Sequence, residues 1–193
     1  MIIYRSIDSR EDLLTIVQDQ LLRRYTMELD GTSYLLYGYT MDHLTERVVH
    51  HLSNGLGFNL AYTCSTPRLQ KIPGSTDSFM GYPLGGITAR ELAIFCHYKQ
   101  VSYQTTSSFL STKGESVYRL ARSMVESLQD ECDSTLHIVI ETMGKLKRCP
   151  EDLPENTKIC LLCGDYSSSE YCSRCEFILA DEKEGLIRAY ISQ

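Results

Sequence analysis

Residues 33–52, SYLLYGYTMDHLTERVVHHL, contain the pattern that decides the fold. The first seven, 33–39, are aromatic and almost wholly apolar, which is typical of a strand buried in a sheet. The following residues have the spacing of a helix that ends near Gly55. A nearly all-apolar strand joined to helices predicts a parallel sheet that is covered on both faces. One face of the helix carries Leu44, Val48, His51 and Leu52.

The segment before this stretch, residues 9–25, also has helical spacing. Ser9 is a favoured N-cap residue, and Asp12 occupies the third helical position in a variant of the capping box. A DGT turn at residues 30–32 separates this helix from the strand. The apolar face of the helix consists of Leu14, Val17, Leu21 and Tyr25, with Leu13 beside it.

The middle of the chain is less regular. Residues 61–80 are polar and rich in Ser, Thr and Pro, so we predict a loop there. GYPLG, residues 81–85, has the character of the end of a strand, and VSYQ, 101–104, of one more short strand.

Three more helices are predicted. The first begins at Thr88, because Thr88 and Glu91 form a full capping box. Residues 115–131 are clearly amphipathic. Residues 134–148 fit a helix better than a strand, since they have a capping serine and a glycine stop. The apolar line of the 115–131 helix is Val117, Leu120, Met124 and Leu128.

Composition limits the class of protein. The 193 residues suffice for one domain with a small appendage, and 42% of them are hydrophobic. The N-terminus, MIIYRSIDSRED, is not a signal peptide, and no apolar window is long enough to span a membrane. The net charge of −6 disfavours binding to nucleic acid by this chain alone. We therefore expect a cytoplasmic chain with reduced thiols and no membrane partner.

Four of the eight cysteines lie in one stretch, CLLCGDYSSSEYCSRC, residues 160–175. Two CxxC pairs separated by eight residues predict a closed, structural zinc site with four thiolate ligands. An iron–sulfur cluster also takes four thiolates, and a redox CxxC is the other alternative, although it would start a helix after a strand. Cys149 is a further candidate ligand, more simply read as a linker residue. The predicted metal ligands are Cys160, Cys163, Cys172 and Cys175.

These patterns predict an α/β domain over residues 1–148, a linker over 149–158, and a zinc module with a tail over 159–193. The chain has no glycine-rich phosphate-binding turn, no GxSxG and no HExxH. On local motifs alone, it is not an enzyme.

Other reactive side chains have simpler interpretations. His50 and His51 are neighbours on a helix and point in different directions, so they do not form a metal pair, and His51 is read as a core histidine. Cys96 and His97 are adjacent in sequence, whereas a catalytic couple requires adjacency in space. Cys64 is a lone loop cysteine.

Three segments together resemble one family. YGYTMDHLTE, 37–46, resembles the GHNxDDxxET stretch of PP-loop ATPases that modify tRNA: Gly38, Asp42 and Glu46 match. YPLGGITARELAIFCHYKQV and STLHIVIETMGKLKR resemble two later segments of that fold. With the cysteine-rich end, this order is similar to the cytoplasmic tRNA 2-thiolation protein 2 family. The departures within the first motif are Tyr39, Thr40, His43 and Arg47.

The resemblance implies part of a PP-loop-like parallel-sheet domain, and a role in making 2-thiouridine at wobble position 34 (5-methoxycarbonylmethyl-2-thiouridine) of cytosolic tRNAs for Lys, Glu and Gln. The family member is the heterodimer partner of a catalytic subunit, and sulfur comes from a thiocarboxylated ubiquitin-related modifier. The SGGxDS loop is missing, so ATP is not expected to bind this chain productively. The resemblance also implies that the N-terminal half of the family chain is lacking, which predicts a sheet edge for another polypeptide to cover.

The basic patch KLKR supplies the candidate tRNA contacts, Lys145, Lys147 and Arg148, by attraction to phosphate. A solvated helix end explains the same residues. Two other functions stay open: a stand-alone zinc-binding interaction module without a tRNA role, and a sulfurtransferase that carries persulfide on its own cysteines.

Overall fold

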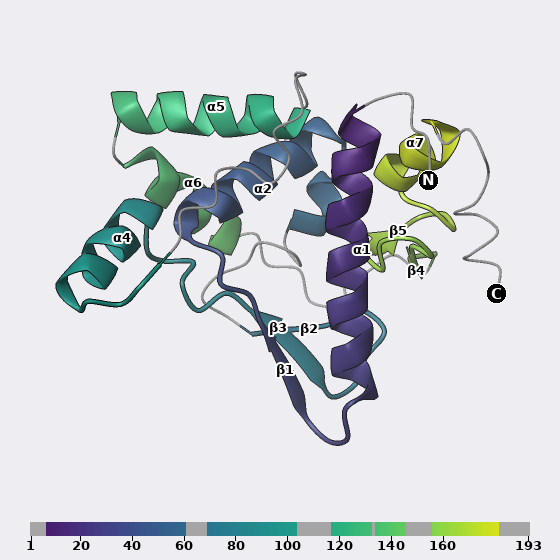
Figure 1. Ribbon diagram of the computed structural model, residues 1–193. Helices are drawn as coiled ribbons and strands as arrows, with labels where there is room; N and C mark the ends of the chain where they lie inside the picture. The colour runs from purple at the N-terminus through teal and green to yellow at the C-terminus, as the bar shows by residue number, and fades with distance from the viewer. Residues whose placement is uncertain (1–6, 61–68, 104–116, 133, 146–155, 182–193) are drawn as a thin grey trace.

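A three-stranded sheet forms one end of the molecule (Figure 1). The computed structural model describes residues 7–60, 69–103, 117–132, 134–145 and 156–181. The strand order is β1 (Ser33–Leu36), β3 (Ser78–Gly81) and β2 (Gln70–Lys71). β1 and β3 are parallel, in register from Ser33 opposite Ser78 to Leu36 opposite Gly81, and β2 is antiparallel to β3. The parallel pairing confirms the prediction from the apolar strand.

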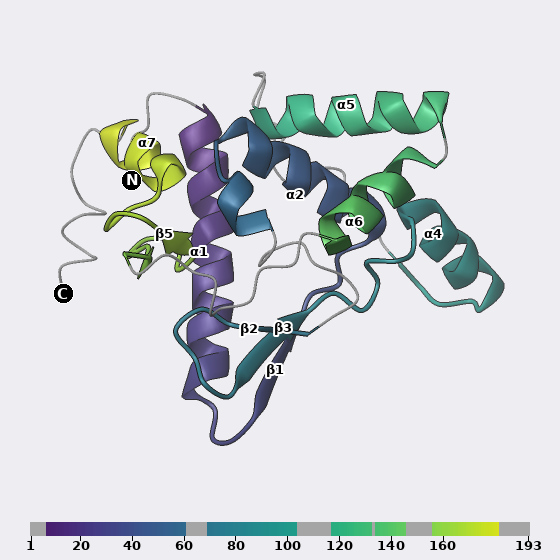
Figure 2. The same cartoon turned by 180° about the vertical axis from the view of Figure 1, so that it is seen from behind.

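Helices cover the carboxyl ends of β1 and β3. α2 (Met41–Ser53) packs against α5 (Val117–Glu131) and α6 (Thr135–Lys145). The main core lies where these helices meet the sheet, and Leu44, Met80 and Leu136 are fully buried in it. Figure 2 shows the three helices grouped above the strands. In the described part of the chain, no helix is long and apolar enough to cross a membrane.

The helix predictions are confirmed in position. α1 spans Ile7–Glu28, α4 spans Ala89–Tyr98, and residues 135–145 are helical rather than extended. α4 has the predicted capping box, since Glu91 N donates to Thr88 Oγ1 (3.2 Å) and Thr88 N to the Glu91 carboxylate (2.8 Å). α1 starts before Ser9, so Ser9 is not its N-cap.

Strand positions were predicted less well. β2 and the first three residues of β3 lie in the segment 61–80 that we expected to be a loop, and β3 ends at Gly81, the first residue of the predicted strand end GYPLG. β1 ends at Leu36 rather than at residue 39. Residues 101–103 are not a strand, because Val101 N donates to Cys96 O and closes the end of α4. The strands are too short for a clear period-two pattern, and pairing with β1 decides where β3 lies.

The buried side of α5 is shifted from the predicted apolar line. α5 buries Ala121 and Val125, one residue round from the predicted line, and leaves Leu120 and Met124 exposed. The small Ala121 allows α5 to lie close to α2. On α2, the prediction is correct for three positions, and Leu52 is exposed.

α1 shows the larger disagreement. Its predicted apolar face is exposed to solvent: the side chains of Leu21 and Tyr25 on that face are 61% and 65% exposed. The opposite side of the helix is buried, and there Ile16 is accompanied by the polar residues Arg23 and Thr26. The sheet is likewise not covered on both faces as predicted, since Tyr34 and Leu36 of β1 are exposed.

Candidate functional site

The four cysteines of the predicted site come together in space. Their Sγ atoms all lie within 4.8 Å of one another, and all four side chains are buried. The Sγ atoms of Cys163 and Cys172 are 3.7 Å apart. The two CxxC pairs, which eight residues separate in the sequence, therefore form one four-thiol centre.

A small hairpin and a helix start build this centre. β4 (Lys158–Ile159) and β5 (Tyr166–Ser167) pair, and between them the first CxxC turns at Gly164, whose φ of +67° is a conformation that favours glycine. Cys172 lies directly before α7 (Ser173–Asp181), and its N–H donates to the Cys160 sulfur at 3.4 Å. The second pair thus lies at the start of a helix.

The donor set fits a single tetrahedral ion. With a zinc–sulfur bond near 2.3 Å, tetrahedral geometry places neighbouring thiolates about 3.8 Å apart. The 3.7 Å separation of Cys163 and Cys172 agrees with that spacing. Four buried thiolates so close together require a cation to offset their repulsion. When bound, such an ion supplies a structural cross-link, because four protein ligands leave no open position for chemistry.

The cysteine centre is packed directly on α1. The four cysteines share a core with Ile16 of α1, Leu56 and two residues of α7, Ile178 and Leu179. Asn59 Nδ2, in the short 3-10 helix η1 (Gly57–Asn59), donates to Tyr166 O at 2.9 Å. The tail is therefore anchored to the α/β domain and does not depend on its linker for its position.

Buried ion pairs strengthen this junction. Arg23 of α1 donates to Asp165 at 2.8 Å, and Arg174 of α7 binds both oxygens of Asp12 at 3.0 and 2.8 Å. His50 Nε2 lies 3.1 Å from Asp12. Burial alone would raise the pKa of Asp165, but the charge of Arg23 and its hydrogen bond hold that pKa below the usual range. Asp12 is thus an ion-pair partner rather than the capping residue that the sequence predicted.

Local sequence patterns could not find these pairs. Arg23 and Asp165 are 142 positions apart, and Asp12 and Arg174 are 162 apart. The one available signal was a set of charged residues on the side of α1 away from its apolar face.

The predicted nucleotide-motif residues hold the protein together. Asp42 accepts a hydrogen bond from Ala89 N at 2.6 Å, which joins the starts of α2 and α4. Glu46 is buried, 3.2 Å from Arg122 Nε and 3.4 Å from the Tyr118 hydroxyl. Burial raises the pKa of Glu46, and the charge of Arg122 opposes that effect. Gly38 lies between β1 and α2, where an added Cβ would meet no other heavy atom within 4 Å.

Aromatic rings fill the space around this motif. Tyr39, which departs from the family pattern, stacks on Tyr37 at 5.2 Å and on Tyr82 at 6.0 Å. The Arg47 guanidinium lies 5.2 Å from the centre of the Tyr39 ring. Two of the departures from the motif are therefore in contact with each other.

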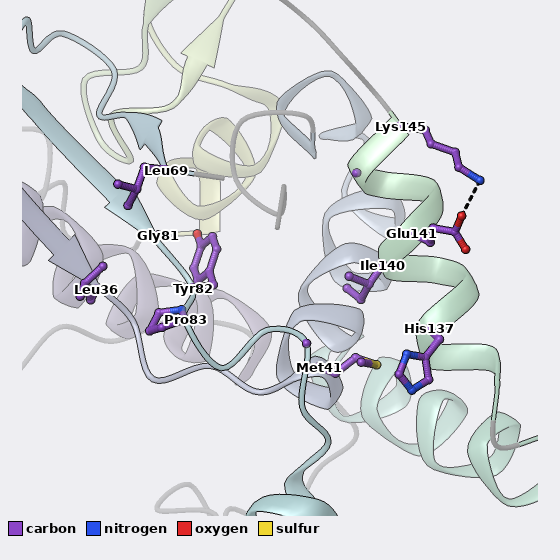
Figure 3. A pocket seen from close by; sticks show the side chains of 12 residues that line it. Leu36, Met41, Leu69, Gly81, Tyr82, Pro83, His137, Ile140, Glu141 and Lys145 are labelled. Carbon is purple, nitrogen blue, oxygen red and sulfur yellow. Dashed lines mark ion pairs between the residues drawn. The ribbon is translucent and has the colours of Figure 1, made fainter. Parts of the chain in front are cut away.

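A groove of about 790 Å³ opens beside this stack, at the carboxyl ends of the parallel strands (Figure 3). Its walls are β1, the segment after β3, and α6, and His137, Ile140 and Glu141 line the α6 side. Lys145, the described member of the predicted tRNA contacts, forms an ion pair with Glu141 at 2.8 Å. Lys147 and Arg148 lie outside the described residues.

The remaining candidates fit their simpler interpretations. His51 is buried in the core as predicted, and neither ring nitrogen has a hydrogen-bond partner among the described residues. Burial, followed by the charge of Arg47, lowers the pKa of His51 to about 3. Cys96 is half-buried beside His97 on α4, and Cys64 and Cys149 lie outside the described residues.

Comparison with known proteins agrees with the resemblance seen in the sequence. No family model matches the chain. A "Cytoplasmic tRNA 2-thiolation protein 2" of Pyrenophora tritici-repentis is 23% identical over 167 residues, which cover 82% of this chain and 42% of the relative. Proteins of the same name from Phaeosphaeria nodorum (24% identical, covering 82% and 42%) and Candida glabrata (23%, covering 80% and 36%) also match. The chain is similar to the cytoplasmic tRNA 2-thiolation protein 2 family.

The chain spans about two-fifths of the length of these relatives. Among solved structures, it is similar to the U34-tRNA thiolase NcsA from Methanococcus maripaludis with its 4Fe–4S cluster, with a TM-score of 0.55 and 17% identity. That match covers 86% of this chain and 51% of NcsA. At 17% identity the match shows a similarity of fold alone, and that similarity confirms the predicted PP-loop-like α/β class.

Proposed function

We propose that this chain acts in tRNA thiolation, as a non-catalytic subunit beside a catalytic PP-loop subunit in the cytoplasm. The observation that carries the proposal is the similarity to proteins named for tRNA 2-thiolation, which extends over about four-fifths of the chain. The fold similarity to a U34-tRNA thiolase supports it independently. The substrate would be wobble uridine 34 of tRNAs for Lys, Glu and Gln, with sulfur from a ubiquitin-related modifier that reaches the partner.

The contacts of the nucleotide motif support a non-catalytic role. A working nucleotide site needs backbone N–H groups and acidic side chains that are free to meet phosphate and metal. In this chain Glu46 is bound to Arg122, and Asp42 to Ala89 N. The stacked Tyr37, Tyr39 and Tyr82 occupy the adjoining space. The chain would therefore contribute structure to the complex, and its partner would bind ATP.

The cysteine centre would hold one zinc ion as a structural cross-link. Burial of all four sulfur atoms supports this role over sulfur transfer, because a carrier persulfide must be reached by an acceptor. The ion would fix the tail on α1, together with the pairs Arg23–Asp165 and Asp12–Arg174.

The basic end of α6 would meet the tRNA backbone. Lys145, Lys147 and Arg148 form the dense basic patch of the sequence, and phosphate contacts of this kind weaken as salt increases. Lys145 is 72% exposed at its side chain and bound to Glu141, so it can exchange that partner for phosphate at little cost.

Cells that lack the gene for this chain provide the direct test. We expect loss of 2-thiouridine at position 34, measured by mass spectrometry of purified tRNA, and recovery with the wild-type gene. Glu46→Gln should also restore thiolation, whereas Cys175→Ser should not. Unchanged thiolation in the deleted cells would contradict the proposal and favour a stand-alone metal-binding module.

Co-purification with the catalytic subunit tests the partnership separately. Wild-type chain and Glu46→Gln should both retain the subunit. If Cys→Ser variants kept their metal and their partner but stopped sulfur transfer, the persulfide-carrier function would replace the one proposed here.

A further inference from the structure

A small cavity of about 150 Å³ is lined by residues of α1, α2, α5 and α7. The ends of these four helices lie together in both views of the molecule (Figure 1 and Figure 2). One water molecule needs only about 10–15 Å³ of such space, so the cavity has room for a larger guest. Its lining includes the exposed Gln18 and the buried His51, so the cavity extends from the surface to the interior. A small ligand can therefore enter it from solvent.

The buried end of this cavity contains polar atoms without a partner. His51 is 3% exposed, and neither of its ring nitrogens has a hydrogen-bond partner among the described residues. A buried polar atom without a partner is destabilising, and native proteins seldom contain one. The core position of His51 explains its burial but leaves both nitrogens unsatisfied. A ligand in the cavity would supply the missing partner.

The lining of the cavity is rich in hydrogen-bond donors and positive groups. Two guanidinium groups and three imidazole rings contribute to it, and the described residues that line it include no carboxylate. Four of these five side chains come from α2, at positions i, i+4, i+7 and i+8, which lie on one face of a helix. The five residues are His43, Arg47, His50, His51 and Arg174. This lining suits a negatively charged ligand.

Ion pairs hold the two guanidinium groups in place. Arg47 lies 3.3 Å from Asp19, and Arg174 binds Asp12 at 2.8 Å, both on α1. A guanidinium has five N–H donors in a rigid plane, a geometry that matches the oxygens of phosphate and similar anions. Because the two aspartates fix these side chains, an anion would meet groups that are already positioned.

We propose that this cavity binds one small tetrahedral oxyanion, phosphate or sulfate, through Arg47, Arg174 and the ring of His51. The charges of the two arginines are balanced by Asp12 and Asp19, and uptake of a proton by the imidazole rings can balance the anion. A bound anion would connect α2 to α7 and so join the α/β domain to the cysteine centre. The proposal holds whether or not the chain acts on tRNA.

Two other kinds of ligand fit the cavity less well. A metal ion would be repelled by the guanidinium groups, and in the described part of the chain only the four cysteines bring three or more ligand atoms close enough for a metal. A molecule of nucleotide size is too large, because ligands of that size occupy pockets of about 300–1,000 Å³.

Histidine-ring NMR of the purified chain with its metal tests the proposal. Sodium phosphate or sodium sulfate is added, with sodium chloride at equal ionic strength as the reference. We expect the ring signals of His43, His50 and His51 to shift and to saturate with a dissociation constant of about 1 mM or below. The exposed His97 and His137 should follow the chloride reference. Saturation by either anion supports the site, and the tighter of the two identifies the ligand.

Arg47→Gln should weaken anion binding at least about tenfold, because it removes a charged hydrogen-bond donor from the lining. Arg122→Gln is the matched control. Arg122 is likewise paired with a carboxylate, that of Glu46, but does not line the cavity, so binding should stay within about twofold of wild type. His51→Leu assigns the ring signal of that residue.

The wild-type titration gives a result even where a variant does not fold, since the control rings are in the same spectrum. Parallel shifts of all five rings would overturn the proposal. The same holds if neither anion differs from chloride, as expected for a cavity that contains only water. Wild-type affinity in a folded Arg47→Gln protein would also contradict it.

Discussion

The cysteine centre and the strand–helix junction at residues 37–46 are both motifs typical of functional sites, and they differ in what surrounds them. The cysteine centre keeps all its ligands, in a geometry that is closed and buried. The junction has lost part of its motif, and the remaining acidic residues bind Arg122 and Ala89 N. An intact motif can thus be structural, while an incomplete one can still indicate the family that the chain resembles.

Among the changes that test this comparison, removal of one cysteine should have the largest effect on the protein. Cys175→Ser is expected to abolish metal binding and to unfold the tail together with its contacts to α1, because metal binding and folding are coupled at such sites. Circular dichroism melting and metal analysis would measure both. Cys96→Ser on α4 is the control and should change neither. A Cys175→Ser protein with wild-type stability would show that the centre is not a cross-link.

Loss of one partner of the buried Arg23–Asp165 ion pair should have the second-largest effect on stability. Arg23→Ala leaves the Asp165 carboxylate buried without its partner, and we expect a loss of about 3–5 kcal/mol in the free energy of unfolding. The double variant Arg23→Met with Asp165→Leu should recover much of that stability. Denaturant titration of the three proteins would measure this, and equal stabilities of the two variants would contradict it.

The buried His51 should make the stability of the folded protein depend on pH. Its pKa is about 3 in the folded protein against about 6.5 when unfolded, so the unfolded state binds the extra proton between those values. Stability should therefore fall as pH decreases from about 6.5 toward 3, by at most about 1.4 kcal/mol per pH unit. His51→Leu should flatten that slope when both proteins carry the same metal load. Identical slopes in chemical denaturation across this range would refute the assignment.

Glu46→Gln at the junction should have the smallest effect. It removes a charge from a partly exposed pair with Arg122 but keeps a hydrogen-bonding side chain, so we expect a loss of about 1 kcal/mol in stability. Thiolation in cells should stay near the wild-type level. A drop of several orders of magnitude in thiolation, with the fold intact, would instead assign a catalytic role to this residue.

Sequence reasoning succeeded where the signal is local. Helical spacing located α1, α2, α4, α5 and α6, and the two CxxC pairs identified the centre that the structure brings together. It failed where tertiary contacts decide which side of a helix is buried or where a strand lies. The apolar spacing of α1 predicted a helix correctly, but the pairs Arg23–Asp165 and Asp12–Arg174 hold its charged side toward the core. β3 lies in a polar segment because pairing with β1, rather than its own composition, places it.

Metal analysis of the purified chain tests the central claim, that the cysteine centre is a closed structural site for a single ion. The 3.7 Å between the sulfurs of Cys163 and Cys172 suits one tetrahedrally bound ion, so we expect one metal ion per chain, which we propose is zinc. About four irons per chain, with the visible absorption of an iron–sulfur cluster, would contradict the claim.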